Sequence, residues 1–89
     1  MASPITLTHQ DESIQEVTYG VCAPTMLQDP QINAIKFNAI SSCMLFEDGA
    51  CQTSPVATLE PIVFNADTII RKGDSSELIS HFFICSQVQ

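Results

Sequence analysis

The sequence is poor in basic residues and in glycine, and it has no tryptophan. Its 89 residues include three Lys and Arg against ten Asp and Glu, which gives a formal net charge of −7. Binding to nucleic-acid phosphates or to anionic membranes relies on clustered Lys and Arg, so the composition argues against both. Only three glycines are present, and no Gly-rich phosphate-binding loop is found.

The chain also lacks a long apolar segment, and no signal peptide is recognised in its sequence. No stretch approaches the roughly 20 apolar residues that cross a bilayer, so no membrane insertion is expected. Residues 1–4 carry neither the basic nor the apolar region of a signal peptide. The protein is therefore either intracellular or a secreted chain whose signal peptide has been removed, and the cysteines must decide between the two.

Cysteine is the residue type that best indicates the compartment. The even number and the absence of a C-x-x-C pair favour two disulfides over a metal site; the four residues are Cys22, Cys43, Cys51 and Cys85. Three pairings are possible, and disulfides imply an oxidising, extracellular setting. The alternative is four reduced, buried thiols in a cytosolic protein. Because so small a domain hides only about 60% of its unfolded surface, cross-links would supply stability that the core lacks.

Apolar residues occur in short runs that alternate with polar ones, which predicts strands. The predicted strands are 5–8, 17–21, 32–37, 43–46, 62–64, 68–70 and 80–85. A helical stripe also fits 32–44, but Asn33, Asn38 and the Ser41–Ser42 pair are weak helix formers, so strands are preferred. No linker divides the chain, and one all-β domain over 1–89 is predicted.

Two segments form a degenerate internal repeat. Residues 32–37 and 79–84 both start with isoleucine, continue with two small or polar residues and end with apolar ones. Two all-β halves, each too small to bury its own face, would stack as a sandwich. We therefore expect a double Greek key, with a first motif over about 4–38 and a second over about 40–87.

Two short segments resemble the signatures of a βγ-crystallin Greek-key motif. Residues 45–48 (Leu-Phe-Glu-Asp) resemble the opening hairpin, in which Phe46 takes the place of the family's tyrosine, and 77–82 resemble the closing segment. In the first half, 29–37 is similar to the closing segment and 5–12 only loosely to the opening one. The cysteines make the chain similar to small secreted fungal proteins of this fold, which include killer toxins, antifungal proteins and virulence effectors.

This resemblance implies a disulfide pattern and a cofactor. It implies that Cys43 and Cys51 close a hairpin and that Cys22 joins Cys85. Family calcium sites draw oxygen ligands from the acidic turn and the closing segment; the corresponding residues here are Glu47, Asp48, Asp29, Asn33, Glu77 and Ser80. Pro30 and Asn33 depart from the family's pattern, and turn acids are commonly just solvated. No other cofactor is expected.

Groups for catalysis are missing from the sequence, so no enzyme and no catalytic residues are predicted. No G-x-S-x-G element is present. Ser80 and His81 are neighbours on a predicted strand, where successive side chains point to opposite faces. A free thiol nucleophile would conflict with the two disulfides.

Function is therefore expected in the loops 23–31, 53–61 and 71–77. Arg71, Lys72 and Asp74 give the last loop a mixed charge that suits a protein partner. Phe83 is either an exposed aromatic anchor or a residue buried by the second sheet.

The leading functional prediction is a secreted, monomeric, non-enzymatic interaction protein, effector- or toxin-like, that binds a host or competitor protein. One alternative is an inhibitor of an extracellular hydrolase or protease that uses 53–56 as a substrate mimic stiffened by Pro55. The other alternative is a calcium-binding, βγ-crystallin-like structural protein.

Overall fold

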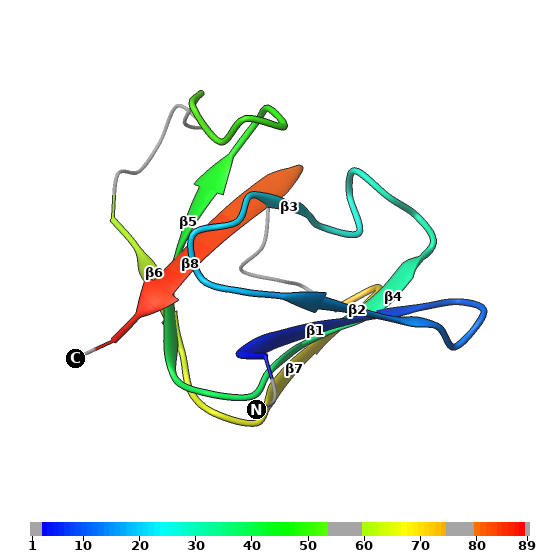
Figure 1. The fold of residues 1–89 in the computed structure, drawn as a ribbon. Coiled ribbons are helices and arrows are strands. Elements are labelled where there is room, and N and C mark those ends of the chain that lie inside the picture. The colour runs from blue at the N-terminus through cyan, green and yellow to red at the C-terminus, as the bar shows by residue number, and fades with distance from the viewer. Residues whose placement is uncertain (1–2, 54–59, 75–79, 89) are drawn as a thin grey trace.

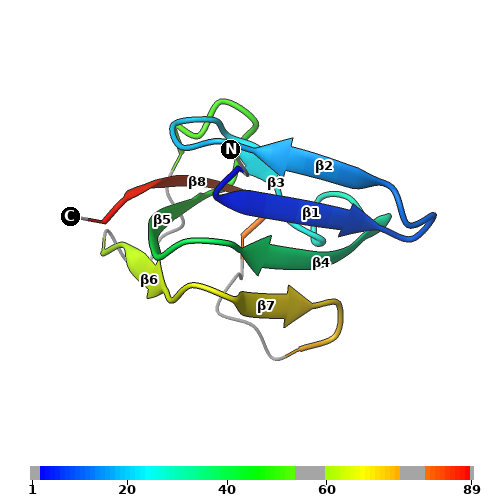
Figure 2. The ribbon, with the colours of Figure 1, turned by 60° about the horizontal axis from the view of Figure 1, so that its bottom comes forward.

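The computed structural model describes residues 3–53, 60–74 and 80–88, which form two sheets of four antiparallel strands. Sheet A has the order β2-β1-β4-β7 and sheet B the order β3-β8-β5-β6. The two sheets cross as separate layers in Figure 1, and Figure 2 shows sheet A face on. The strands are β1 (Ile5–His9), β2 (Ile14–Val17), β3 (Ala23–Pro24), β4 (Ile32–Phe37), β5 (Ser41–Phe46), β6 (Ile62–Phe64), β7 (Thr68–Arg71) and β8 (Phe82–Gln87). Within the described ranges, the chain forms no helix of the length and apolarity that a membrane crossing needs.

The prediction of an all-β protein is confirmed. Alternation of apolar and polar residues placed β1, β4, β6 and β7 to within one residue, because each of these strands has one buried face. The preference for strands over a helix in 32–44 is also confirmed, since β4 and β5 occupy that segment.

The strand predicted at 17–21 is wrong. β2 starts at Ile14 and ends at Val17, and Val21, which should have shared the buried face, is 48% exposed. Gly20 adopts a φ of 82°, which glycine tolerates without strain. Its backbone nitrogen donates to the carbonyl of Cys85 at 2.9 Å, so the chain leaves sheet A after Val17 and runs along β8 in sheet B.

Each sheet combines three strands from one half of the chain with one strand from the other. Sheet A takes β1, β2 and β4 from the first half and β7 from the second, while sheet B takes β5, β6 and β8 from the second half and β3 from the first. β7 lies beside β4 in Figure 2. Read as β6-β5-β8-β3, sheet B has the same relative strand order as sheet A. Neither half therefore completes a sheet alone.

The core lies between the sheets and is more apolar on the side of sheet A. The rings of Phe37 on β4 and Phe64 on β6 stack with their centroids 4.3 Å apart, which joins the two layers. Three buried polar side chains, those of Thr25, Ser41 and Ser80, all lie in or beside strands of sheet B. The buried apolar residues are Ile5, Leu7, Val17, Ala23, Ile32, Ile35, Phe37, Cys43, Phe64, Ile70, Phe83 and Cys85.

The internal repeat is visible in the burial pattern, one residue away from the predicted alignment. Residues 32–37 and 80–85 show the same order of buried, half-buried and exposed side chains. Ile32 therefore corresponds to Ser80. The sequence pattern had aligned Ile32 with Ile79, which lies outside the described residues.

All four cysteines form disulfides, as predicted, but the implied pairing is wrong. The bonds are Cys22–Cys51 and Cys43–Cys85, instead of Cys43–Cys51 and Cys22–Cys85. Cys43 on β5 stands directly opposite Cys85 on β8, and both are buried in the core. The resemblance placed Cys43 and Cys51 across a hairpin, but β5 pairs with β6 and β8. Cys51 instead lies in the loop after β5, where it bonds to Cys22 ahead of β3.

The Cys43–Cys85 disulfide takes the place of an apolar pair in the other sheet. With 32–37 aligned on 80–85, Phe37 corresponds to Cys85. Ile5 stands opposite Phe37 as Cys43 stands opposite Cys85, so the two pairs are equivalent. Sheet B therefore has a covalent cross-link where sheet A has two large buried side chains.

Removing the two disulfides one at a time tests their relative weight. The bonds close loops of 29 and 42 residues, for which chain entropy gives about 3.5 and 4 kcal/mol of stability. The Cys43→Ala/Cys85→Ala variant should lose more stability in urea unfolding than Cys22→Ala/Cys51→Ala, because truncating buried sulfurs also leaves a cavity. Equal losses would contradict a packing role for the Cys43–Cys85 sulfurs.

Candidate functional site

Several loops meet at one end of the sandwich through hydrogen bonds. The carbonyl oxygen of Pro30 accepts hydrogen bonds from Gln10 Nε2 at 3.1 Å and from Lys72 Nζ at 2.7 Å. In Figure 1 the β1–β2 turn, the β3–β4 loop and the end of β7 lie on the same side of the molecule. We call this region the loop end; it comprises residues 10–13, 25–31, 71–74 and 80–81 together with Glu47.

Thr25 anchors the β3–β4 loop to sheet B. Its side chain is fully buried, and its hydroxyl donates to the carbonyl of Ser80 at 2.6 Å. Its backbone nitrogen donates to His81 O at 2.8 Å, and the hydroxyl accepts a bond from Leu27 N at 3.2 Å. Sequence reasoning missed this residue, since a single threonine in a loop carries no pattern.

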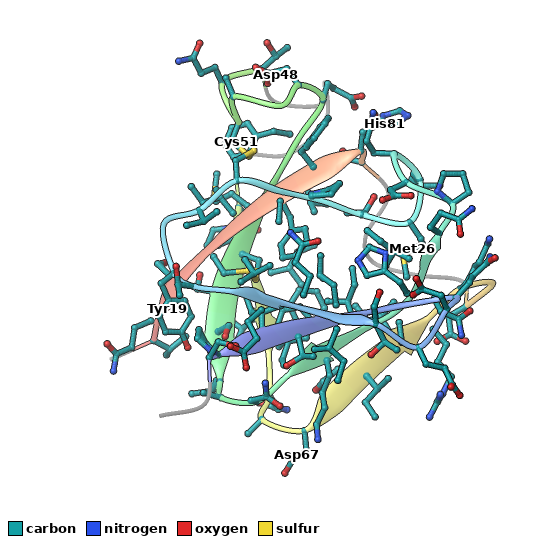
Figure 3. The ribbon with its side chains drawn as sticks, turned by 45° about the vertical axis from the view of Figure 1, so that its right-hand side comes forward. Tyr19, Met26, Asp48, Cys51, Asp67 and His81 are labelled. Carbon is teal, nitrogen blue, oxygen red and sulfur yellow. A yellow bond between two sulfur atoms is a disulfide. The ribbon has the colours of Figure 1, made fainter. Side chains whose placement is uncertain are left out.

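The loop 47–53 is fixed by Asp48 and by the Cys22–Cys51 bond. Asp48 Oδ1 accepts hydrogen bonds from the backbone nitrogens of Thr53 at 2.8 Å and Gln52 at 2.9 Å. These donors stabilise the carboxylate and hold the pKa of Asp48 below its ordinary value. Figure 3 shows Asp48 and Cys51 in this loop, at the opposite end of the view from Asp67.

Two of the predicted calcium ligands meet at the loop end. Ser80 Oγ donates to Glu47 Oε1 at 3.5 Å, and His81 Nδ1 lies 3.4 Å from Glu47 Oε2. Ser80 is buried while His81 is exposed. Both residues precede β8, which begins at Phe82, so the strand predicted at 80–85 starts two residues too early and its opposite-face rule does not apply to this pair. The Glu47–His81 contact is solvated on both sides, with side chains 45% and 47% exposed, and such pairs add little stability.

The remaining calcium candidates are not gathered around Glu47. Asp48 bonds within its own loop, and Asp29 Oδ1 accepts a hydrogen bond from Gln31 N at 3.0 Å in a local turn. Asn33 lies at the start of β4, where its carbonyl accepts a bond from the backbone of residue 72. Glu77 lies outside the described residues. No group of three or more His, Cys, Asp and Glu suited to a metal ion occurs in 3–53, 60–74 and 80–88, and calcium binding stays a prediction.

Three of the four predicted partner-binding residues lie exposed in one turn. Arg71 N donates to Asp74 Oδ2 at 2.8 Å, Asp74 N donates to Arg71 O at 3.1 Å, and Lys72 reaches across to Pro30. Phe83 is different, because its side chain is 0% exposed. It fills the core between the sheets, so the reading of Phe83 as a surface anchor is wrong. The predicted inhibitory loop 53–56 lies outside the described residues except for Thr53.

A hollow of about 400 Å³ opens at the end of the molecule opposite the loop end. Tyr19, Asn38 and Ile40 contribute to its lining. The hydroxyl of Tyr19 lies 3.2 Å from Ile40 O, while Asn38 Nδ2 donates to Ser3 O at 3.0 Å and Thr6 Oγ1 at 2.8 Å. These polar groups are thus bonded within the protein, and those of Asn38 hold the N-terminal segment.

Comparisons with protein-family models, with curated proteins and with solved structures find no match to this chain. The assignment of a function therefore depends on the geometry of the loop end and of the strands that support it.

Replacing Thr25 by valine tests how firmly the β3–β4 loop is held. The change keeps the shape but removes the donor to the Ser80 carbonyl, so unfolding free energy should fall by about 1–3 kcal/mol. Urea unfolding measures the loss. The exposed Thr18→Val change is the matched control and should stay within about 0.5 kcal/mol; equal effects would show that the buried hydroxyl does not anchor the loop.

Acid should weaken the β1–β2 turn and the loop 47–53 through the carboxylates of Asp11 and Asp48. Hydrogen bonds lower the pKa of Asp48, and those from the side chain and backbone of Ser13 lower the pKa of Asp11. A lowered folded pKa gives stability that is present above the unfolded pKa and is lost as pH falls through the folded value. Thermal stability should thus decline below about pH 4.

The Asp11→Asn/Asp48→Asn variant keeps the acceptor oxygens but does not titrate, so its stability should decline less in acid. Asp67→Asn, at the far end of the molecule, is the matched control and should follow the parent protein. Melting temperatures measured between pH 2 and 7 compare the three proteins. Identical acid profiles would contradict the role of the two turn carboxylates.

Proposed function

We propose that this protein is a small secreted, non-enzymatic binding protein, effector- or toxin-like, that attaches to a protein target through its loop end. The observation that carries the proposal is the convergence on Pro30 O of side chains from Gln10 and Lys72, which belong to different halves of the chain. Convergence of this kind makes one preformed surface out of separate loops, and preorganisation lowers the entropy cost of binding.

The scaffold we propose is a double Greek key of the βγ-crystallin type. The exchange of β3 and β7 between the sheets supports it, because three strands of each half stay together while the remaining strand joins the other sheet. The repeated burial pattern of 32–37 and 80–85 also supports a duplicated motif.

Secretion is supported by the sulfur chemistry. Both disulfides are compatible with an extracellular protein, because thiols in the cytosol are kept reduced. The Cys22–Cys51 bond joins the loop 47–53 to the start of β3, the strand that leads into the β3–β4 loop. The shape of the loop end therefore depends on keeping these two cysteines oxidised.

The loop end has the chemistry of a protein-binding surface. Asp29 is half-buried there, and Arg71, Lys72 and Asp74 are exposed, so both charge signs occur within one small area. Leu27, which lies with Asp29 in the β3–β4 loop, is 53% exposed and offers an apolar contact. A mixture of charge and apolar area is typical of protein interfaces.

Target capture with matched variants tests this function. The immobilised protein, Lys72→Glu and Asp67→Lys are exposed to extracellular and cell-surface proteins, and bound proteins are identified by mass spectrometry. A genuine target should be retained by Asp67→Lys, at the far end, and lost or bound at least about tenfold more weakly by Lys72→Glu, which equals about 1.4 kcal/mol.

Two other results would replace the proposal. Stoichiometric inhibition of an enzyme in a hydrolase and protease panel would make the protein an inhibitor. A chelator-reversible rise in melting temperature with millimolar calcium, together with no captured target, would favour the structural calcium-binding alternative. Targets that bind all three proteins equally would show that the loop end is not the binding surface.

A further inference from the structure

Four edge strands border the two sheets, and they differ in how their outer backbone groups are protected. The edges are β2 and β7 in sheet A and β3 and β6 in sheet B. An open edge presents unpaired N–H and C=O groups to which another chain can add a strand, and proteins block such edges with proline or with covering side chains. Only every second residue of an edge strand points its backbone outward.

β3 is blocked by a proline at its outward position. Thr25 N donates to His81 O, so Thr25 faces β8 and Pro24 faces away from it. Proline has no N–H, and this edge therefore offers no donor at that place.

β6 is protected in a similar way. Successive residues of a strand point their backbone groups to opposite sides, so the registers of β3, β8 and β5 fix the direction for β6. The backbone groups of Ile62 face Cys43 of β5. Those of Pro61 and Val63 face outward. Pro61 has no donor, which leaves Val63 as the single outward residue with an N–H among residues 60–64.

β7 is blocked at one of its two outward residues by the carboxylate of Asp74, while Ile69, the other outward residue, keeps its N–H. Lys72 N donates to Asn33 O, so Lys72 faces β4 and the preceding Arg71 faces outward. Asp74 Oδ2 accepts the hydrogen bond of Arg71 N at 2.8 Å, and Asp74 N donates to Arg71 O at 3.1 Å. Both outward groups of Arg71 are therefore already bonded.

β2 is the edge that the described residues leave most open, with two outward N–H groups where β6 and β7 keep one each. His9 N donates to Ser13 O at 2.9 Å. Because hydrogen-bonded pairs recur at every second residue, Gln15 and Val17 also point their backbone groups toward β1. The backbone groups of Ile14 and Glu16 therefore point outward. Within 3–53, 60–74 and 80–88, no strand and no side chain bonds to these groups. The side chain of Ile14 is 65% exposed, the most among the large hydrophobic residues described.

Charge selects the kind of segment that fits this edge. Exposed Asp11 and Glu12 lie in the turn that leads into β2, and exposed Glu16 follows Ile14 by two residues; none of these carboxylates forms an ion pair in the described part of the chain. The protein as a whole carries a net charge of −7. A second copy would bring Glu16 against further carboxylates, whereas cross-strand pairs of opposite charge are favourable.

We propose that the outer edge of β2 binds an extended basic segment of a partner protein as a fifth strand of sheet A. Main-chain hydrogen bonds form at Ile14 and Glu16, an apolar side chain of the segment packs on Ile14, and a Lys or Arg stands opposite Glu16. This surface adds to the loop end and does not depend on it.

Binding of a short probe peptide tests the proposal. The probe alternates lysine and valine and carries a fluorophore, and its matched control alternates glutamate and valine. The Lys/Val peptide should bind in fluorescence anisotropy, and the amides of Ile14 and Glu16 should become protected from hydrogen exchange in the complex. The Glu/Val peptide should not bind.

Variants separate strand addition from simple charge attraction. Ile14→Pro removes an outward N–H that has no partner within the protein and should weaken binding at least about tenfold, a free-energy change of about 1.4 kcal/mol. Ile69→Pro removes the matching outward N–H on β7 and should leave the affinity unchanged. Glu16→Lys, which keeps the backbone, should weaken binding about fivefold, and melting curves confirm that each variant folds.

Specific results would overturn the proposal. Peptide binding that survives in a folded Ile14→Pro, or a complex in which the Ile14 and Glu16 amides still exchange freely, would show attraction to the acidic surface alone. Self-association of the protein that Ile14→Pro abolishes would assign the edge to a second copy. Loss of target capture by Lys72→Glu leaves the peptide assay unaffected, so the two proposals fail separately.

Discussion

The exchange of β3 and β7 between the sheets is the constraint on which the rest of the structure depends. Because each sheet obtains its fourth strand from the other half of the chain, one half cannot bury its apolar face without the other. The exchange also brings the loops that flank the two exchanged strands to the same end of the molecule. The contacts of Thr25 with Ser80 and of Lys72 with Pro30 are direct consequences, since each joins a segment beside an exchanged strand to the opposite half.

The disulfides compensate for a weak inner face in sheet B. Where sheet A buries Ile32 and the Ile5–Phe37 pair, the equivalent places in sheet B hold Ser80 and the Cys43–Cys85 bond. The hydroxyl groups that are thereby buried find partners, and no buried side-chain nitrogen or oxygen of the described residues lacks a hydrogen bond. Hydrogen-bonded polar groups contribute less net stability than buried apolar area does. A covalent cross-link in this sheet is therefore more consequential than one in sheet A would be.

The sequence predicted strands better than it predicted contacts. Alternation found most of the strands that have one buried face, but it placed the second strand at 17–21, across Gly20, whose positive φ marks the crossing to the other sheet. It could not pair the cysteines, because Cys51 was read into a hairpin although the partner of β5 is β6, which begins 11 residues later at Ile62. The sequence predicted the part of the loop end that contains Arg71 and Lys72. It did not predict Thr25, because the contact of Thr25 with Ser80 forms only when β3 pairs with β8 in sheet B.

The edge strands show that equivalent positions in the two halves of the chain hold different residues. In the register, Pro24 and Arg71 occupy equivalent outward positions on β3 and β7; one lacks a donor, and the other has its N–H bonded by Asp74. Pro61 and Glu16 are likewise equivalent. Pro61 precedes Ile62, which stands opposite Cys43, and Glu16 precedes Val17, which stands opposite Ile5. Proline there removes the donor, whereas glutamate keeps it and adds charge. Like charge disfavours pairing with an identical edge, so glutamate protects β2 against self-association while leaving it open to a basic strand.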